Sequence, residues 1–152
     1  MTTLGIRNNN PFNVEITNPP EPWQGRDPTQ KHPAQMGVAK TQMNRFVRML
    51  DPVSGIRMGL RNLIYYFDHL DKRTIRDVVS TWAPSNDSIM RNHTAAYISN
   101  VSAWSGFGPA EVLNLHDWDT LWKIGRAMVR QENGVDPYTD AQWTKAMVMA
   151  GI

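Results

Sequence analysis

Asn, Pro and Gly punctuate the first third of this chain, and their spacing limits its fold more than any other feature. Runs such as NNNPFN and NPPEPWQGRDP interrupt a regular helix, because proline lacks an amide donor and its ring clashes with the preceding turn. Apolar side chains recur in the same stretch, among them Phe12, Val14, Ile16 and Trp23, so we expect it to pack against a core. We predict an irregular lobe over residues 1–50, with short strands in VEIT and NRFVRML.

From residue 51 onward the apolar spacing becomes helical. In SGIRMGLRNLIYYFDHL one apolar stripe follows a helix face, and Ser54 is the expected N-cap. A shorter helix is predicted in PAEVLNL, starting at Pro109. The other helical segments are TIRDVVSTWAP with Thr74 as cap, HTAAYISNVSAWSG with Gly106 as the stop, DTLWKIGRAMVRQENG, and TDAQWTKAMVMAG with Thr139 or Asp140 as cap. These segments predict a helical lobe of five or six short helices over residues 51–152, and therefore a mainly α fold.

Length and composition indicate one domain over residues 1–152 and exclude several chemistries. A chain of 152 residues with 41% hydrophobic and 20% charged residues is long enough for one core. The absence of cysteine excludes disulfides and thiolate catalysis, and the four histidines form no close pair, so we expect no metal and no cofactor. A net charge of +2 is too small to favour nucleic acid. No apolar run approaches the roughly 18 residues of a membrane span, and no secretion signal is visible.

One carboxylate, Glu132, lies where a purely solvated acidic residue is unexpected. It follows Met128 by four residues and so continues the apolar stripe of its helix, which Asn133 and Gly134 then end. Burial and the negative end of the helix dipole both disfavour its ionised form and would raise its pKa. A carboxylic acid protonated near neutral pH can donate a proton to a glycosidic oxygen. The alternative is a solvated side chain, or one paired with an arginine of the same helix.

The order of several short motifs resembles a family of phage-encoded cell-wall hydrolases and virion proteins. GIRNNNPFN, WQG, SGIR, WAP and ENG match a pattern that begins Gly-Ile-Arg-Asn-Asn-Asn-Pro-Gly-Asn and continues with Trp-x-Gly. The resemblance spans nearly the whole chain. Three residues depart from the family pattern at positions that bear on substrate preference: Phe12 replaces the usual glycine, Val53 stands where an acidic residue is common, and Arg91 precedes Asn92 in place of a glutamate.

A second resemblance is to autolysin-type glucosaminidases and soluble lytic transglycosylases, which share a lysozyme-like fold. In those enzymes a helix ending Glu-Ser or Glu-x-Gly carries the catalytic acid and comes first. This chain has NNNPFNV, WQG, RFVRML, YYF, WAP and AAY in the matching order, but its acid-bearing AMVRQENG comes last. The resemblance implies an α+β lysozyme-like domain in circularly permuted order. It predicts that Glu132 lies across a groove from the Asn8–Asn13 loop.

The resemblance also implies roles for individual residues. Glu132 is the expected catalytic acid, and the expected substrate contacts are Asn8, Asn10, Asn13, Trp23, Arg57 and Tyr97. Each contact residue has a structural alternative, because asparagines cap and turn, aromatic side chains pack in cores, and arginines form ion pairs. A conventional hydrolase needs a second acid, for which Glu15 and Asp27 are the candidates. Without one, lytic transglycosylation or a substrate-assisted hydrolysis is expected.

Together these features predict a phage enzyme that cuts the glycan strand of peptidoglycan, as a muramidase, glucosaminidase or lytic transglycosylase. The alternative is a non-catalytic virion protein, of the tail or the ejection apparatus, that keeps the fold, binds the wall and has other virion proteins as partners. Either protein would act in the periplasm or cell wall, reached from the virion or from the host cytoplasm on release. A nucleic-acid-binding role rests only on slight basicity.

Overall fold

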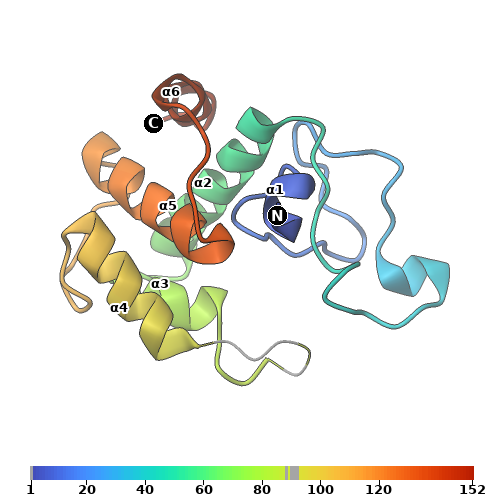
Figure 1. Ribbon diagram of the computed structural model, residues 1–152, viewed down its shortest axis with the longest axis horizontal. Coiled ribbons are helices and arrows are strands. Elements are labelled where there is room, and N and C mark those ends of the chain that lie inside the picture. Colours follow the sequence, from blue (N-terminus) through green and yellow to red (C-terminus); the bar gives the residue numbers. More distant parts are fainter. Residues whose placement is uncertain (1, 88, 90–92) are drawn as a thin grey trace.

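The computed structural model describes residues 2–87, 89 and 93–152, so Arg91 and Asn92 lie outside the described residues. Figure 1 shows an N-terminal lobe, built mostly of coil, beside a helical lobe. The elements in chain order are α1 (Leu4–Arg7), the 3-10 helix η1 (Pro33–Met36), α2 (Pro52–His69), α3 (Ile75–Trp82), α4 (Thr94–Ser105), α5 (Trp118–Asn133) and α6 (Asp140–Met149). The predicted mainly α fold is confirmed at this level.

Helix boundaries follow capping chemistry. Thr74 and Thr139 accept amides of the first turns of α3 and α6, as predicted, and Gly106 ends α4 in a left-handed conformation. Asp117 caps α5, because its carboxylate accepts the Thr120 amide at 2.9 Å.

Two boundary predictions are wrong. Asp51, not Ser54, is the N-cap of α2, since its carboxylate accepts the Ser54 amide and Pro52 occupies the first helical position. PAEVLNL forms no helix. After a turn at Pro109, the Leu113 amide donates to a carbonyl of the loop before α3, at 2.8 Å, and the segment continues as coil.

The segments predicted as strands are reduced to single bridges. Glu15 pairs with Phe46 and Arg26 with Met49, and no longer ladder forms among the described residues. A strand does not extend across Asn13, because its φ of 52° is left-handed. The prolines that follow VEIT lack the amide donors that a ladder requires.

Through its side chain, Asn10 makes some of the hydrogen bonds that a longer strand ladder would make. Its fully buried side chain donates to the carbonyls of Val14 (3.0 Å) and Val47 (2.9 Å) and accepts the Val14 amide (3.0 Å). Asn9 adds a hydrogen bond to the Met49 carbonyl at 3.1 Å. Backbone groups without a strand partner are thereby satisfied inside the lobe.

Two glycines of α2 let the N-terminal lobe lie directly on the helix. A Cβ at Gly55 would come within 1.7 Å of the Asn9 carbonyl oxygen, and a Cβ at Gly59 within 2.1 Å of the Phe12 ring. Phe12 is fully buried and makes an edge contact with Trp82, with 5.9 Å between ring centroids. The residue that departs from the glycine of the resembled family therefore fills the core between the lobes and does not face the surface.

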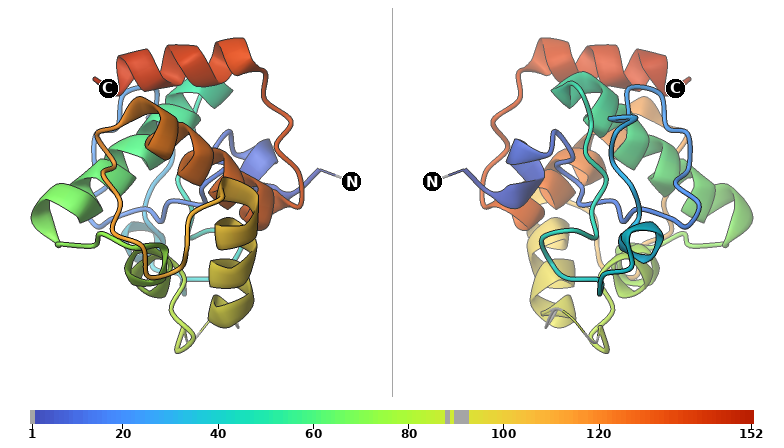
Figure 2. Two further views of the ribbon diagram at one scale, coloured as in Figure 1. Left: turned by 90° about the vertical axis from the view of Figure 1, so that its left-hand side faces the viewer. Right: turned by 90° about the vertical axis from the view of Figure 1, so that its right-hand side faces the viewer.

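The apolar stripe of α2 forms the centre of the core, as predicted. Its buried members are Ile56, Leu60, Leu63, Ile64 and Phe67. Helix α6 packs along α2 at one end of the molecule, and α4 packs against α5 (Figure 2). In the described part of the chain, no helix is long and apolar enough to cross a bilayer.

Candidate functional site

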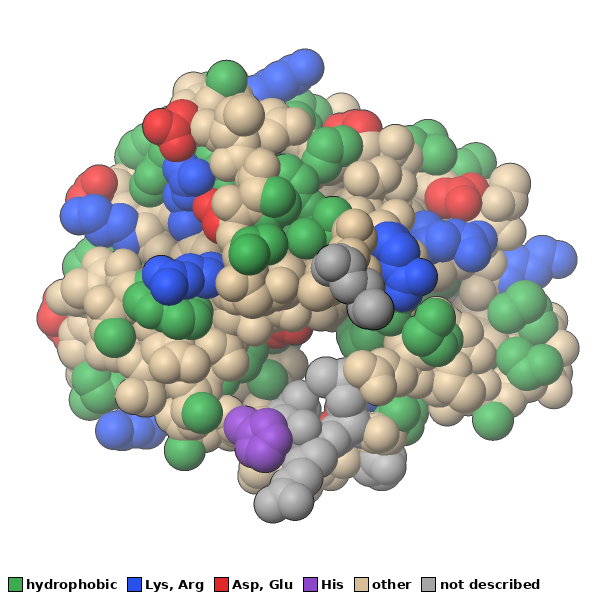
Figure 3. Space-filling model, in the orientation of Figure 1, with side chains coloured by type: hydrophobic (Ala, Val, Ile, Leu, Met, Phe, Trp, Pro, Cys, Tyr) green, Lys and Arg blue, Asp and Glu red, His purple; other side chains and the backbone are tan. Residues whose placement is uncertain are grey.

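A cleft opens where the N-terminal lobe meets the end of α5. It holds about 310 Å³ of space, and the space-filling view shows the surface hollowed between the two lobes (Figure 3). Its walls come from the N-terminal lobe, from α2, from α3 with the segment after it, and from the last turn of α5. The lining residues are Asn13, Val14, Glu15, Arg45, Phe46, Asn62, Tyr66, Thr81, Trp82, Ala83, Pro84, Asp87 and Glu132.

The end of α5 is tied to the start of the chain through Asn133. Its side-chain amide donates to the carbonyls of Pro11 (2.8 Å) and Val129 (2.9 Å), and its Oδ1 accepts from the Thr3 hydroxyl (2.6 Å). The bonds to Pro11 and Thr3 join the last helical turn to a segment more than one hundred residues earlier. They fix the backbone of the neighbouring Glu132 relative to the N-terminal lobe.

Glu132 lies against Asn13 in this cleft. The Asn13 Nδ2 donates to Glu132 Oε1 at 2.8 Å, so the acid lies beside the end of the Asn8–Asn13 loop, in direct contact with it and not across a groove from it as predicted. Glu132 is half-buried. Burial raises the pKa of its carboxyl above the usual 4.5, while the Asn13 amide and the Tyr97 hydroxyl act in the opposite direction. Burial has the larger effect, so the pKa of Glu132 is raised and its protonated form is favoured.

Tyr97 approaches the same carboxyl group from α4. Its hydroxyl is buried and makes no hydrogen bond of ordinary geometry with the described residues, yet it lies near enough to Glu132 for each group to shift the pKa of the other. Burial, and then the charge of Glu132, raise the pKa of Tyr97 well above 10. Tyr97 therefore stays a neutral donor beside the acid.

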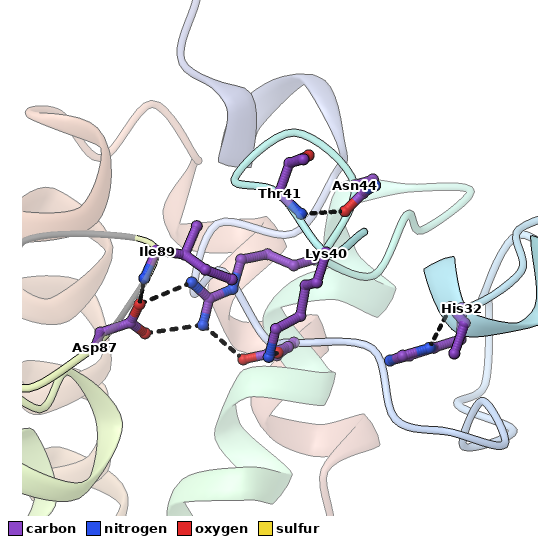
Figure 4. Close-up of polar contacts among 9 residues, drawn as sticks. His32, Lys40, Thr41, Asn44, Asp87 and Ile89 are labelled. Atoms are coloured by element: carbon purple, nitrogen blue, oxygen red, sulfur yellow. Dashed lines mark hydrogen bonds and ion pairs between the residues drawn. The ribbon is translucent and has the colours of Figure 1, made fainter. Parts of the chain in front are cut away.

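The same cleft is lined by two further carboxylates that share one arginine. The buried Arg45 guanidinium donates to Glu15 at 2.9 Å and to both oxygens of Asp87 at 3.2 and 2.9 Å, and Lys40 donates to the second Glu15 oxygen at 2.7 Å (Figure 4). Partial burial acts to raise the pKa of Glu15, but the hydrogen bonds from Lys40 and Arg45 outweigh it and hold that pKa below 4.5. Glu15 is thus kept as an anion in the same cleft that favours protonated Glu132.

Three further lining residues were not predicted as ligand contacts. Asn62 and Tyr66 lie four residues apart on α2 and so share the helix face toward the cleft. Arg45 comes from the N-terminal lobe. The sequence does offer a signal for Asn62, which is a polar residue next to the apolar stripe of its helix. Arg45 offered none, because the strand predicted in NRFVRML does not indicate which of its two faces would line a cleft.

Besides Trp23, four predicted site residues lie away from this cleft. Asn10 is buried in the lobe, and Asn8 ends α1 with its carbonyl accepting the Met49 amide at 2.8 Å. Arg57 donates to a backbone carbonyl at the end of α6 at 3.1 Å. Asp27 accepts the amide and hydroxyl of a nearby threonine, which lower its pKa. Their observed contacts are internal to the fold.

The cleft thus brings together Asn13, Glu15 and Glu132, and the buried Tyr97 lies behind it near Glu132. Trp23 lies at a second depression, described below. Among the described residues, no three His, Asp or Glu side chains are grouped so that they could hold a metal ion.

Fold and cleft together define a small, mainly helical protein in which a half-buried acid at a helix end faces an asparagine-rich lobe. No family model matches the chain. The chain is similar to Protein P5 of Pseudoalteromonas phage PM2, with 31% identity over 136 residues that cover 89% of this chain and 74% of the relative. It therefore belongs to the family of this phage protein.

Proposed function

We propose that this protein is a phage enzyme that cleaves the glycan strand of peptidoglycan, with Glu132 as the acid. The observation that carries the proposal is the setting of Glu132: half-buried in an open cleft, with a raised pKa and an oriented amide partner at 2.8 Å. A carboxyl group whose pKa is raised holds its proton to higher pH, which supports general acid catalysis on a glycosidic oxygen.

In the proposed reaction Glu132 donates its proton to the bridging oxygen as the C1–O bond breaks, and the bonding electrons leave with that oxygen. The sugar develops oxocarbenium character at C1. The Glu132 carboxylate then accepts a proton from the attacking hydroxyl, which restores the acid. Asn13 would orient the carboxyl group, and Tyr97 would stabilise it while ionised.

Lytic transglycosylation is the form of cleavage that the cleft favours. Among the described lining residues, the other carboxylates are Glu15 and Asp87, and both are engaged by Arg45. A carboxylate neutralised in this way is a poor nucleophile or base. The attacking hydroxyl would then be the C6 hydroxyl of the same muramyl residue, and the product a 1,6-anhydro sugar. The order of elements and the contact of Asn133 with Thr3 and Pro11 are in keeping with a permuted lysozyme-like domain.

Membership in a phage protein family agrees with the wall as the site of action. The glycan strand is then the principal partner, and the protein would reach it from the virion or on release from the host cell. A wall-binding virion protein without activity is the outcome if catalysis is absent.

Zymography on purified bacterial walls tests the proposal. The wild type is expected to give a clearing band, and Glu132→Gln to reduce the rate by about 10²- to 10⁴-fold. Glu111→Gln is the matched control, since Glu111 is exposed and outside the cleft. Mass spectrometry of the products should show 1,6-anhydro ends. A folded wild type that clears no wall, or a Glu132→Gln variant that clears as well as its parent, would refute the enzyme.

A further inference from the structure

A second depression lies beside the cleft along α2. It holds about 420 Å³ of space and is lined by Glu21, Trp23, Arg61, Asn62 and Tyr65. Asn62 lines both hollows, so the two are adjacent on the surface. A volume in this range accommodates a small polar ligand or one unit of a polymer.

The geometry of α2 explains how one helix serves both hollows. Asn62 and Tyr66 form one row of side chains at i and i+4, which faces the cleft. Arg61 and Tyr65 form the neighbouring row, which faces the second depression. The two hollows are therefore lined by adjacent rows of a single rigid element, with no loop between them.

The chemistry of the second depression suits a sugar. Trp23 is half-buried and Tyr65 is 51% exposed, so both aromatic rings can be reached by a ligand. Flat aromatic faces pack on the apolar face of a pyranose ring. Glu21 and Arg61 are exposed at the rim and offer acceptors and donors for ring substituents. The Arg61 guanidinium is steadied by a bond to the Ala150 carbonyl at 3.1 Å.

We infer that the second depression is a saccharide subsite, which binds a sugar of the same strand beyond the unit that Glu132 attacks, by stacking on Trp23 and Tyr65. This inference rests on the proposed function for its substrate class. It adds that the protein recognises a polymer, because a strand that reaches from Glu132 to Trp23 must cross Asn62 and occupy both hollows. Affinity should therefore rise with oligomer length until both hollows are filled.

The experiment measures binding separately from cleavage. N-acetyl chitooligosaccharides of two to six units are titrated into Glu132→Gln protein by calorimetry, and the Trp23 indole signal is followed by NMR. The hexamer is expected to bind at least about tenfold more tightly than the dimer, and to shift that signal. When Trp23→Ala or Tyr65→Ala is added to the Glu132→Gln protein, hexamer binding should weaken by about tenfold and dimer binding should stay nearly unchanged.

Trp118→Ala is the matched control, because Trp118 is also partly exposed, at 38%, but lines neither hollow. Should Trp23→Ala fail to fold, Tyr65→Ala still decides, since an exposed tyrosine can be removed without opening the core. If the Glu132→Gln protein and its folded Tyr65→Ala derivative bind the hexamer equally well, the second depression is not a saccharide subsite, even if the wild-type protein clears walls. If Tyr65→Ala loses hexamer affinity but the wild type clears no wall, the second depression still binds saccharide, and only the proposed enzymatic activity is refuted.

Discussion

The two lobes that form the cleft are stabilised by different physics. The helical lobe is built on apolar stripes, with Leu60, Leu121 and Met128 fully buried between helices. The N-terminal lobe has few repeated backbone hydrogen bonds and depends on asparagine side chains and on close approach to α2. The acid thus comes from the lobe held by apolar packing and its partner Asn13 from the lobe held by side-chain hydrogen bonds, so the cleft should be most sensitive to substitutions where the two lobes meet.

The largest effect is expected from Gly55→Ala. Its Cβ would lie 1.7 Å from the Asn9 carbonyl oxygen, which is backbone and cannot move aside without displacing the N-terminal lobe. We predict a loss of about 3 kcal/mol or more in the free energy of unfolding, measured by chemical denaturation.

Gly108→Ala is the matched control. A Cβ there meets nothing closer than 3.7 Å, so the expected change is within about 0.5 kcal/mol. If Gly55→Ala were as stable as Gly108→Ala, the N-terminal lobe would not lie as close to Gly55 as the structure places it.

Asn10→Ala should follow in size. It removes two donors and one acceptor from a fully buried position and leaves the Val14 and Val47 carbonyls and the Val14 amide without their partner. We predict a loss of about 3 kcal/mol. Asn44→Ala, which removes similar bonds at an exposed turn, should cost less than about 1 kcal/mol. Equal losses in the two variants would show that burial of Asn10 adds nothing.

The helical lobe was predictable from sequence because its signals are local. Thr74, Thr139 and Gly106 mark boundaries through bonds to residues within one turn, and the stripe of α2 repeats at helical spacing. The same logic placed Glu132 on a partly buried face. PAEVLNL shows the limit, because the contact that holds Leu113 as coil comes from a distant loop.

The N-terminal lobe was predictable only in outline. The sequence predicts asparagines that either turn the chain or contact a ligand, but nothing local distinguishes Asn10, buried and internal, from Asn13, which reaches the acid. That division depends on which backbone groups lack partners once the lobe has folded. The Arg45 ion pairs have the same origin, since Asp87 lies in a segment far along the chain.

A smaller effect is expected in the pH dependence of stability, which should differ between the two glutamates of the cleft. The folded pKa of Glu132 is raised above 4.5, so its contribution to stability is present below that pH and is lost as pH rises through the folded pKa. The folded pKa of Glu15 is lowered, so its contribution is present above 4.5 and is lost as pH falls through the folded pKa. The two walls should therefore respond to pH with opposite sign.

Melting temperatures from pH 3 to 8 would measure this difference. Relative to Glu132→Gln, the wild type should lose stability as pH rises. Relative to Glu15→Gln, it should gain stability as pH rises, by a modest amount because the Glu15 side chain is 37% exposed. Parallel curves for the two comparisons would contradict the opposed settings of the two carboxylates.

The smallest effect on stability, and the most specific on activity, is expected from Tyr97→Phe. The hydroxyl has no hydrogen bond of ordinary geometry within the described residues, so its removal should change stability by less than about 0.5 kcal/mol. Because Tyr97 acts to lower the pKa of Glu132, its removal should move the alkaline limb of the pH profile for wall cleavage to higher pH. Tyr138→Phe is the control: Tyr138 also has a buried hydroxyl without a hydrogen bond there, and burial raises its pKa to about 12, but the charge that acts on it is that of Asp136 and not that of Glu132. A profile that shifts equally in both variants, or in neither, would mean that Tyr97 does not act on the acid.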